Sequence, residues 1–353
     1  MYDARLQNTF IEKKISMARR EPVTRKMVAE EAGVSVTIVS YVVNDNRYVN
    51  KDKKQRVLDA IKKLGYRPNA IAQTLKSKRS YHILFIADQI DNEHFGKLLF
   101  EMDSHLSDKG YLISLAHSQD NDEFITRIIS RQFDGVIISS LSMREQHVRA
   151  IADAGIPVVL LMNRSYTNLP ENVGKVFTGL YQGARTCVKH LYDTGCRNIL
   201  YVDRMSSRGH FSDLSDLRLK GYIDEMASLD LPFDSEKIIT GCVNESEVIE
   251  RITEYIKSGK PVDAIFARND RLAAVAMHAV KKIGLLIPDE ISVIGFDNST
   301  LSHYTTPSLT TVDIDRKGAG QAAVNILQEM IVDSGNSTSV QLETSLILRK
   351  STK

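Results

Sequence analysis

The alternation of apolar and polar positions between Thr24 and Asn44 predicts two short helices joined by a tight turn. Thr24 can cap the first helix with its hydroxyl, and small apolar residues form one face of that helix. Gly33 ends it, because a residue without a Cβ suits a sharp turn between crossed helices. Ser35 can cap the second helix. The inward positions of that helix are spaced by one, three and four residues: Ile38, Val39, Val42 and Val43.

The opposite face of the second helix is polar or short, a pattern typical of a DNA-binding helix-turn-helix. An ordinary αα-hairpin is the alternative. A third helix follows, with Asn50 as its cap, Gly65 as its end and Val57 on its apolar face. Three helices closing a small core predict a headpiece over residues 22–66. For residues 1–21 a basic arm, a packing element and a disordered leader all remain open, and the leader is our expectation.

From Tyr81 onward, buried strand patterns alternate with helical ones, which predicts parallel doubly wound sheets that bind ligands at the carboxyl ends of their strands. The alternation of strands and helices starts again near Tyr181, which predicts a second lobe. Two lobes that face one another are expected to form a cleft. Strands are expected at 82–88, 111–117, 135–140, 157–163, 198–203, 237–241, 263–268 and 291–297. Helices are expected at 96–109, 122–131, 144–154, 181–194, 217–227, 246–258 and 272–283.

Charge separates the headpiece from the rest of the chain. The 353 residues hold 46 Lys and Arg against 44 Asp and Glu. The first 80 residues contain 18 of these bases and 8 of these acids, so the remainder contains 28 and 36. A basic head on an acidic body indicates a polyanion partner for the head, and a structural hairpin has no need of this asymmetry.

Composition narrows the class of protein further. The chain is 42% hydrophobic and 25% charged, which is ordinary for a soluble protein of two or three domains. No apolar run approaches the ~20 residues that span a bilayer, and no signal peptide is apparent, so we expect a cytoplasmic protein with no membrane partner. The three cysteines, at 187, 196 and 242, have no spacing typical of a metal site or of disulfides. We therefore expect no metal.

Motifs of catalysis and of cofactor binding are missing from the sequence. No GxGxxG follows a strand, no P-loop lysine is present and no GxSxG occurs, so we expect neither catalytic residues nor a cofactor. Two rival interpretations remain beside a DNA-binding regulator. One is a free-standing sugar-binding protein, and the other is a sugar-modifying enzyme with an appended DNA-binding domain.

Four segments of the core, together with the headpiece, carry a specific resemblance. They are SDLRLKGY at 215–222, AIFARND at 264–270, IPDEISVIGFD at 287–297 and PSLTTVDIDRKGAGQAA at 307–323. With them the chain resembles the LacI/GalR family of transcriptional regulators over about residues 22–350. The resemblance implies an all-α helix-turn-helix headpiece joined to an α/β core of two doubly wound parallel-sheet lobes, similar to periplasmic binding proteins.

The resemblance also implies domain boundaries. A hinge helix or linker is expected at 67–80 and a two-lobed effector-binding and dimerisation core at 81–353. The first lobe would hold about 81–179 and 311–332, and the second about 180–310 and 333–350. The hinge helix would order in the DNA minor groove with Leu75 as a wedge that kinks the duplex. The alternative is that Leu75 is a linker residue that docks on the core.

The implied function is a sequence-specific regulator, a repressor, whose operator affinity a small metabolite controls. The expected partners are a pseudo-palindromic DNA operator, an effector of the sugar class and a second copy of the chain. Whether the effector induces or corepresses stays open. The expected DNA-binding residues are Thr24, Ser35, Val36, Thr37, Ser40, Tyr41, Asn44, Tyr48, Asn69 and Leu75. The expected effector-binding residues are Asp88, Phe95, Arg164, Arg218, Asn269 and Asp297.

Some positions depart from the family pattern or carry a second interpretation. Tyr41 stands where the family usually has arginine, which removes the usual guanine contact. Val275 replaces a usual glycine, and the acidic residue often found near Thr178 is missing. Arg164 could serve in a structural ion pair instead of contacting an effector, and Asp270 is expected to be a helix N-cap instead of a ligand-binding residue.

Overall fold

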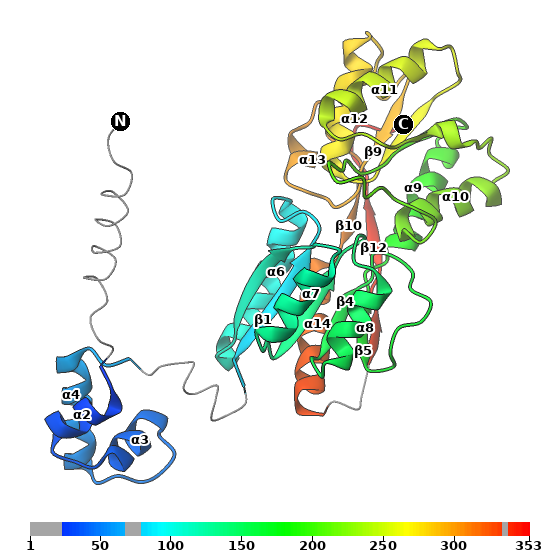
Figure 1. Cartoon of the computed structure of the whole chain (residues 1–353). Coiled ribbons are helices and arrows are strands. Elements are labelled where there is room, and N and C mark those ends of the chain that lie inside the picture. Colours follow the sequence, from blue (N-terminus) through cyan, green and yellow to red (C-terminus); the bar gives the residue numbers. More distant parts are fainter. Residues whose placement is uncertain (1–22, 68–78, 334–337) are drawn as a thin grey trace, which may run out of the picture. The chain divides into compact units, whose positions relative to one another are not determined.

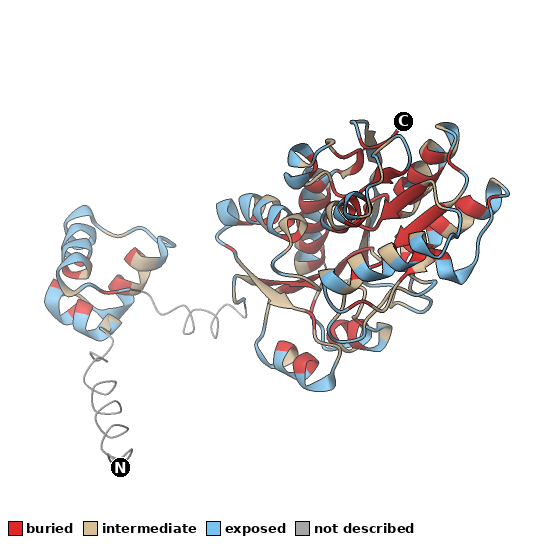
Figure 2. Ribbon diagram, turned by 90° about the horizontal axis from the view of Figure 1, so that it is seen from above, coloured by how far each residue is buried: buried red, intermediate tan, exposed pale blue. Residues whose placement is uncertain are grey.

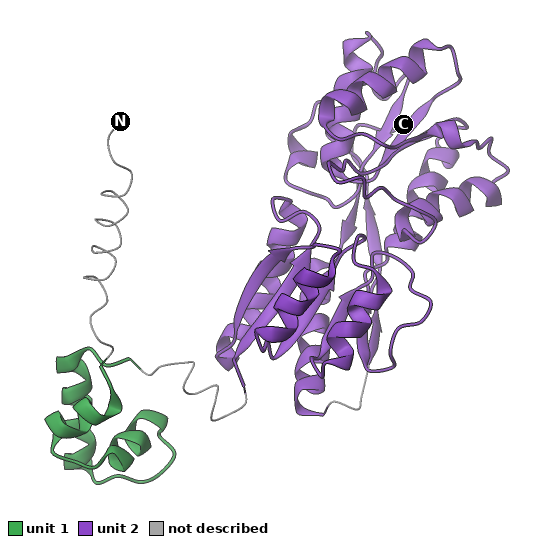
Figure 3. Cartoon of the chain, viewed as in Figure 1, with its two compact units in different colours: residues 1–78 green, residues 79–353 purple. Residues whose placement is uncertain are grey.

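The computed structural model describes residues 23–67, 79–333 and 338–353. The chain divides into two compact units, residues 1–78 and 79–353 (Figure 3). Residues 1–21 and most of the expected hinge, including Asn69 and Leu75, lie outside the described residues.

The headpiece consists of α2 (Arg25–Ala32), α3 (Val36–Asn44) and α4 (Lys51–Leu64), and it confirms the three predicted helices. The Thr24 hydroxyl accepts a hydrogen bond from the Met27 amide at 3.3 Å, and the Ser35 hydroxyl caps α3 in the same way. Gly33 ends α2 at φ +61°, a left-handed conformation that glycine adopts without strain. The buried core is small and mostly aliphatic. It contains Val28, Ala29, Ala32, Val39, Val42, Val57, Ala60 and Tyr66.

The first lobe of the core is a six-stranded parallel sheet in the order β11-β5-β4-β3-β1-β2. Its strands are β1 (His82–Ala87), β2 (Leu112–His117), β3 (Gly135–Ser139), β4 (Val158–Leu161), β5 (Val173–Phe177) and β11 (Ser339–Gln341). Its helices are α6 (Glu93–Leu106), α7 (Asp122–Ser130), α8 (Glu145–Asp153) and α14 (Arg316–Val332). A 3₁₀ turn, η1 (Ser107–Lys109), follows α6.

Alternate residues of β1 point to opposite faces of this sheet. Ile83 and Phe85 pack in the cluster that includes residues of α6 and α14, whereas Leu84 and Ile86 pack in the cluster that includes residues of α7 and α8. The central strands β1, β3 and β4 are buried, and the outer faces of the helices are exposed (Figure 2). The lobe is therefore a three-layer α/β domain.

The second lobe is a four-stranded parallel sheet in the order β7-β6-β8-β9. Its strands are β6 (Ile199–Val202), β7 (Ile238–Ile239), β8 (Ala264–Ala267) and β9 (Ser292–Ile294). Buried residues of α9 (Leu180–Asp193) and α10 (Leu217–Ser228) share one cluster, and those of α11 (Glu245–Lys257) and α12 (Asp270–Lys282) share the other. Two short elements complete it, the 3₁₀ turn η2 (Ser235–Lys237) and α13 (Leu301–Tyr304).

An antiparallel pair of strands, β10 (Thr311–Ile314) and β12 (Thr344–Ile347), runs where the chain passes between the lobes (Figure 1). The strands and helices expected from the sequence are present, with ends shifted by a few residues. The short strands β5, β10, β11 and β12 and the helices α13 and α14 were not predicted.

The expected lobe boundaries need correction at the C-terminal crossovers. Residues 311–314 were expected in the first lobe, but Val312 and Ile314 are buried in a cluster of the second lobe. Residues 333–350 were expected in the second lobe, but β11 pairs with β5 in the sheet of the first. The reason is that the polar, three-residue β11 gains backbone hydrogen bonds only by adding to a sheet edge. The chain thus passes between the lobes three times.

Gly221 on α10 provides a test of how closely α9 and α10 pack. A Cβ at this position would collide with the backbone carbonyl of Tyr181 and lie 2.9 Å from the Cβ of Ala184. Gly221→Ala should therefore lower the free energy of unfolding by about 1–3 kcal/mol, as overpacking does. Gly96 on α6 is the matched control, because nothing lies within 4 Å of a Cβ added there. Urea unfolding of both variants tests this, and a Gly221→Ala protein as stable as Gly96→Ala would contradict it.

Candidate ligand-binding cleft and nucleic-acid interface

The cleft lies where the strand order of each sheet reverses. The order reverses between β1 and β3 in the first lobe and between β6 and β8 in the second, and ligands of such sheets bind outside the carboxyl ends at this point. Polar side chains follow each of these strands. Asp88, Ser140 and Arg268 come directly after β1, β3 and β8, and Arg204 is the second residue after β6. The topology thus brings polar strand ends from both lobes together.

A cavity between the lobes has a free volume of only about 60 Å³. This is room for about two water molecules, well below the roughly 300–1,000 Å³ of pockets that hold drug-sized ligands. The lobes are closed on one another, and a metabolite needs more room than this cavity leaves. The cavity is lined by Asp88, Gln89, Asn92, His94, Phe95, Leu141, Asn163, Arg204, Met205, Arg218, Arg268, Asn269, Arg271, Leu272 and Asp297.

Two buried arginines of the second lobe are held by carboxylates of the same lobe. Arg218 on α10 donates to Asp297 at 2.8 Å, and its guanidinium lies 4.5 Å from the centre of the Phe296 ring. Arg268 forms an ion pair with Asp216, which also caps α10 by accepting from the Arg218 amide at 2.9 Å. These pairs keep buried charges satisfied and fix the cavity wall.

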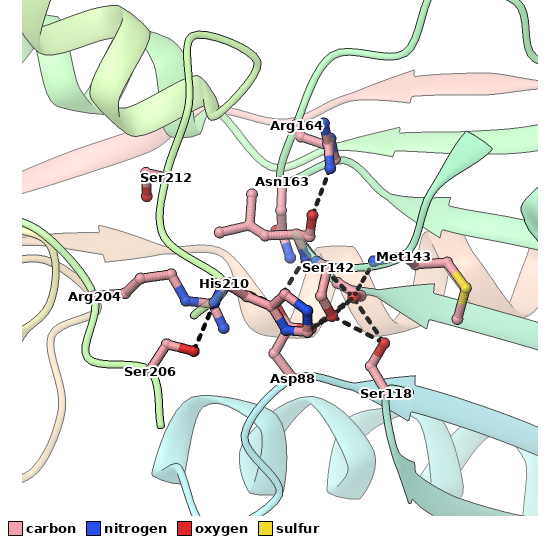
Figure 4. Close-up of polar contacts among 12 residues, drawn as sticks. Asp88, Ser118, Ser142, Met143, Asn163, Arg164, Arg204, Ser206, His210 and Ser212 are labelled. Carbon is pink, nitrogen blue, oxygen red and sulfur yellow. Dashed lines mark hydrogen bonds and ion pairs between the residues drawn. The ribbon is translucent and has the colours of Figure 1, made fainter. Parts of the chain in front are cut away.

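Asp88 is the polar centre of the first lobe's side of the cleft (Figure 4). Its carboxylate accepts from the Ser140 hydroxyl at 2.6 Å, the Leu141 amide at 2.8 Å and the Ser142 hydroxyl at 2.8 Å. Arg204 of the second lobe donates to it at 3.1 Å. Burial acts to raise the pKa of Asp88, but the Arg204 charge and these hydrogen bonds outweigh it, so the pKa lies below its ordinary value. Asp88 is therefore charged and fully hydrogen-bonded.

Other contacts between the lobes support the closed arrangement. The Glu93 carboxylate at the start of α6 accepts from the Thr300 hydroxyl at 2.7 Å and from the Thr300 amide at 3.1 Å. The Ser165 amide donates to the Ser215 carbonyl at 2.8 Å. The two lobes are thus joined at several positions around the cavity.

Arg164 was expected to face the effector, but the structure places it beside the main cavity. It donates to the Leu141 carbonyl at 2.6 Å and pairs with Asp213 of the second lobe at 3.5 Å. It lines a separate cavity of about 200 Å³ with residues of the loop 209–216. The other five expected effector-binding residues all line the main cavity: Asp88, Phe95, Arg218, Asn269 and Asp297.

The expected role of Asp270 as a helix cap is wrong, because Asn269 caps α12 by accepting from the Leu272 amide at 2.9 Å. Asp270 is buried and accepts from the Ser299 amide at 2.6 Å and from the Thr311 hydroxyl of β10 at 2.5 Å. Burial, with a smaller contribution from the neighbouring Asp297 charge, raises the pKa of Asp270 to about 7. Its carboxyl group thus joins α12 to the strand that leads into the first lobe.

Sequence reasoning did not name several residues of the cavity, among them Arg204, Arg268 and His94. Arg204 and Arg268 each follow a strand that was predicted, so their position at the strand ends was an available signal. His94 was not named, although the expected residues Asp88 and Phe95 lie on either side of it in the sequence. Burial lowers the pKa of His94 to about 4, so its imidazole is neutral, and its Nδ1 has no hydrogen-bond partner among the described residues.

The candidate DNA-contacting surface of the headpiece includes the first turn of α3 and the loop after it, both of which are exposed. Val36 and Thr37 are exposed, and Tyr48 is 91% exposed. The guanidinium of Arg47 lies 5.3 Å from the centre of the Tyr41 ring. Asn44, also exposed, donates to the Ser40 hydroxyl at 3.2 Å. Polar groups on an exposed helix terminus are suited to contact base edges and phosphates.

Metal clusters and membrane-spanning helices are both absent from the described ranges. Among residues 23–67, 79–333 and 338–353, no cluster of three or more His, Cys, Asp or Glu side chains could hold a metal ion. No helix in the same ranges is long and apolar enough to cross a membrane.

Comparison with known proteins identifies relatives of both units. The family model "Bacterial regulatory proteins, lacI family" matches residues 24–69, and "Periplasmic binding protein-like domain" matches residues 188–352. Catabolite control protein A of Priestia megaterium is 31% identical over 338 residues, covering 94% of this chain and 99% of the relative. The HTH-type transcriptional repressor PurR of Actinobacillus pleuropneumoniae is 28% identical, covering 94% of this chain and 98% of the relative.

The fold is also that of a solved structure. The Lac repressor dimer bound to operator and the anti-inducer ONPF matches with a TM-score of 0.80 at 24% identity, covering 94% of this chain and 99% of that one. The expected fold class is therefore confirmed: a helix-turn-helix headpiece and a two-lobed α/β core with parallel sheets.

Asp270 gives a prediction for pH dependence. Its folded pKa lies above the unfolded value, so its contribution to stability is full below about pH 4 and is lost as the pH rises towards about 7. Asp270→Asn keeps an amide oxygen for Ser299 and Thr311 but does not titrate. As the pH rises across this range, the parent should lose stability relative to Asp270→Asn. The difference between their free energies of unfolding should therefore fall. Asp289→Asn, an exposed site in the same lobe, is the control. A difference that does not change with pH would refute the buried, raised pKa.

Proposed function

Because the chain belongs to the LacI family of bacterial regulatory proteins, we propose that it is a DNA-binding transcriptional repressor controlled by a small polar metabolite in the cleft. The observation that carries the proposal is the combination of two features in one chain. An exposed helix-turn-helix surface is joined to a core whose polar strand ends converge on one cavity. The proposal assigns no catalytic reaction and places the protein in the cytoplasm, where DNA is accessible.

The proposed DNA target is a pseudo-palindromic operator bound by a homodimer. The Lac repressor structure contains a dimer on its operator, and we extend that arrangement to this chain. Val36, Thr37, Ser40 and Tyr41 would face the bases, and the remaining expected headpiece residues would contact the backbone. Leu75 retains its proposed role as the minor-groove wedge.

A sugar or sugar derivative is the effector class that the cleft chemistry supports best. Arg218 with Asp297 places a donor fork beside a carboxylate acceptor in one lobe, and Arg204 and Asp88 supply a second fork and a second acceptor from opposite lobes. A sugar hydroxyl both donates and accepts, so neighbouring hydroxyls can bind such pairs. The Nδ2 of Asn269 adds donors, since its Oδ1 is used by the helix cap.

Control of DNA binding requires that the effector bind two states of the core with different affinities. The closed core leaves about 60 Å³, so effector binding is coupled to the separation of the lobes. The effector is an inducer if the separated core has the weaker operator affinity and a corepressor if it has the stronger one. The three crossovers are the segments through which this motion passes.

The basic headpiece predicts strongly salt-dependent DNA binding. With six to ten phosphate contacts per dimer, affinity for a labelled duplex should fall by roughly 10³ to 10⁵ between 50 and 200 mM salt. Fluorescence anisotropy of the full chain measures this, with a chain that starts at residue 79 as the control that should not bind. Salt-insensitive binding, or equal binding by the truncated chain, would count against the proposal.

Arg218 should couple the effector to DNA. Alanine would leave Asp297 buried without its partner, at a cost of about 3–5 kcal/mol, so lysine is the better substitution. Arg218→Lys keeps the charge but loses the planar fork and its contact with Phe296. Operator binding without effector should stay at the parent level. The effector concentration for a half-maximal response should rise about tenfold, as expected for a lost charge-assisted hydrogen bond.

The readout is operator binding titrated with the sugar that gives the largest thermal shift in a screen. Arg251→Lys, at an exposed site in the same lobe, should respond as the parent does. An Arg218→Lys protein that responds at the parent's effector concentration would remove Arg218 from the effector site.

A further inference from the structure

Arg204 differs from the other arginines that line the main cavity. Arg218 and Arg268 pair with carboxylates of their own lobe. Arg271 pairs with Glu245 of its own lobe at 2.8 Å and lies 3.9 Å from the exposed carboxylate of Asp91 in the first lobe, so it keeps a partner in its own lobe. Within the described ranges, the ion pair found for Arg204 is with Asp88, across the cleft in the first lobe, at 3.1 Å. The Arg204 side chain is only 11% exposed, so its charge is balanced in a largely desolvated site.

The two partners of this ion pair do not depend on each other equally. Asp88 has three further donors, all in its own lobe: the Ser140 hydroxyl, the Leu141 amide and the Ser142 hydroxyl. No second acceptor is found for the Arg204 guanidinium among the contacts of the described residues. Separation of the lobes would therefore leave Asp88 stabilised and Arg204 without its counter-charge.

A ligand that enters the cleft must separate the lobes, because the closed cavity is too small for a metabolite. It then meets a cationic fork at the carboxyl end of β6. A neutral hydroxyl can accept a hydrogen bond from this fork but cannot balance its charge. Carboxylate and phosphate oxygens do both, and they can accept two parallel hydrogen bonds from one guanidinium.

We propose that the effector carries an anionic group, a carboxylate or a phosphate, that binds Arg204 in the place of Asp88. The effector would thus be an acidic sugar instead of a neutral one. Asp88 would repel the anionic group only weakly. Asp88 moves away with the first lobe, and its carboxylate keeps its hydrogen bonds from three donors. This inference rests on the proposed function and specifies its effector class.

Matched sugar series test the proposal on the full chain. The probes are D-glucose, D-glucuronate and D-glucose 6-phosphate, with the corresponding galactose and mannose series, each titrated by calorimetry. At least one acidic member should bind at least about tenfold more tightly than its neutral parent. The carboxylate and phosphate arms show which anion is preferred. Two results would overturn the proposal. One is that neutral sugars bind as tightly as acidic ones, and the other is that none of the acidic sugars binds.

Variants at Arg204 separate charge recognition from a structural role. Arg204→Gln should abolish the preference for the acidic member, and Arg204→Lys should retain part of it. Both should fold, because Asp88 keeps its other donors, and a thermal melt checks this. Arg208→Gln, an exposed arginine in the same loop, is the control and should keep the full preference. A preference that survives Arg204→Gln would overturn the assignment.

The same experiments distinguish this inference from the proposed function. If a neutral sugar binds and changes operator affinity, the proposed function stands and the anionic effector is wrong. If the chain does not bind DNA, the proposed function fails whichever sugars bind the cleft.

Discussion

Parallel strands end at one edge of their sheet, and the position of every candidate ligand-binding residue in the core follows from this constraint. Two such edges face each other, so the side chains after β1, β3, β6 and β8 meet in one cavity. Charges buried in that position must be paired. Three arginines there accordingly form ion pairs with Asp88, Asp216 and Asp297, and the pair with Asp88 joins the two lobes.

Closure of the lobes and recognition of a ligand therefore use the same groups. In the closed core, Arg204 and Asp88 satisfy each other across the cleft, and Glu93 and Thr300 add a second contact between the lobes. A ligand has to replace some of these contacts with its own. Its binding energy is thus divided between recognition and separation of the lobes, which is the coupling that a ligand-controlled regulator needs.

The sequence predicted the elements whose signals are local and repeated. Caps at Thr24 and Ser35, together with apolar spacing, located the headpiece helices, and alternating strands and helices located both sheets. The short crossover strands have no such signal, because β11 becomes a strand only by adding to β5. Local sequence also could not separate Asn269 from Asp270 as the cap of α12, since both residue types cap helices. The role of Arg204 depends on its ion pair with Asp88 across the cleft, and no local sequence pattern predicts that pair.

The central claim is that DNA binding by the headpiece and ligand binding by the cleft are coupled, and thermodynamic linkage tests it most directly. The affinity of the full chain for operator is measured with and without the bound sugar, and the affinity for the sugar is measured with and without operator. The account predicts that both affinities change by the same factor and that this factor differs from one. Equal sugar affinities with and without operator would contradict it.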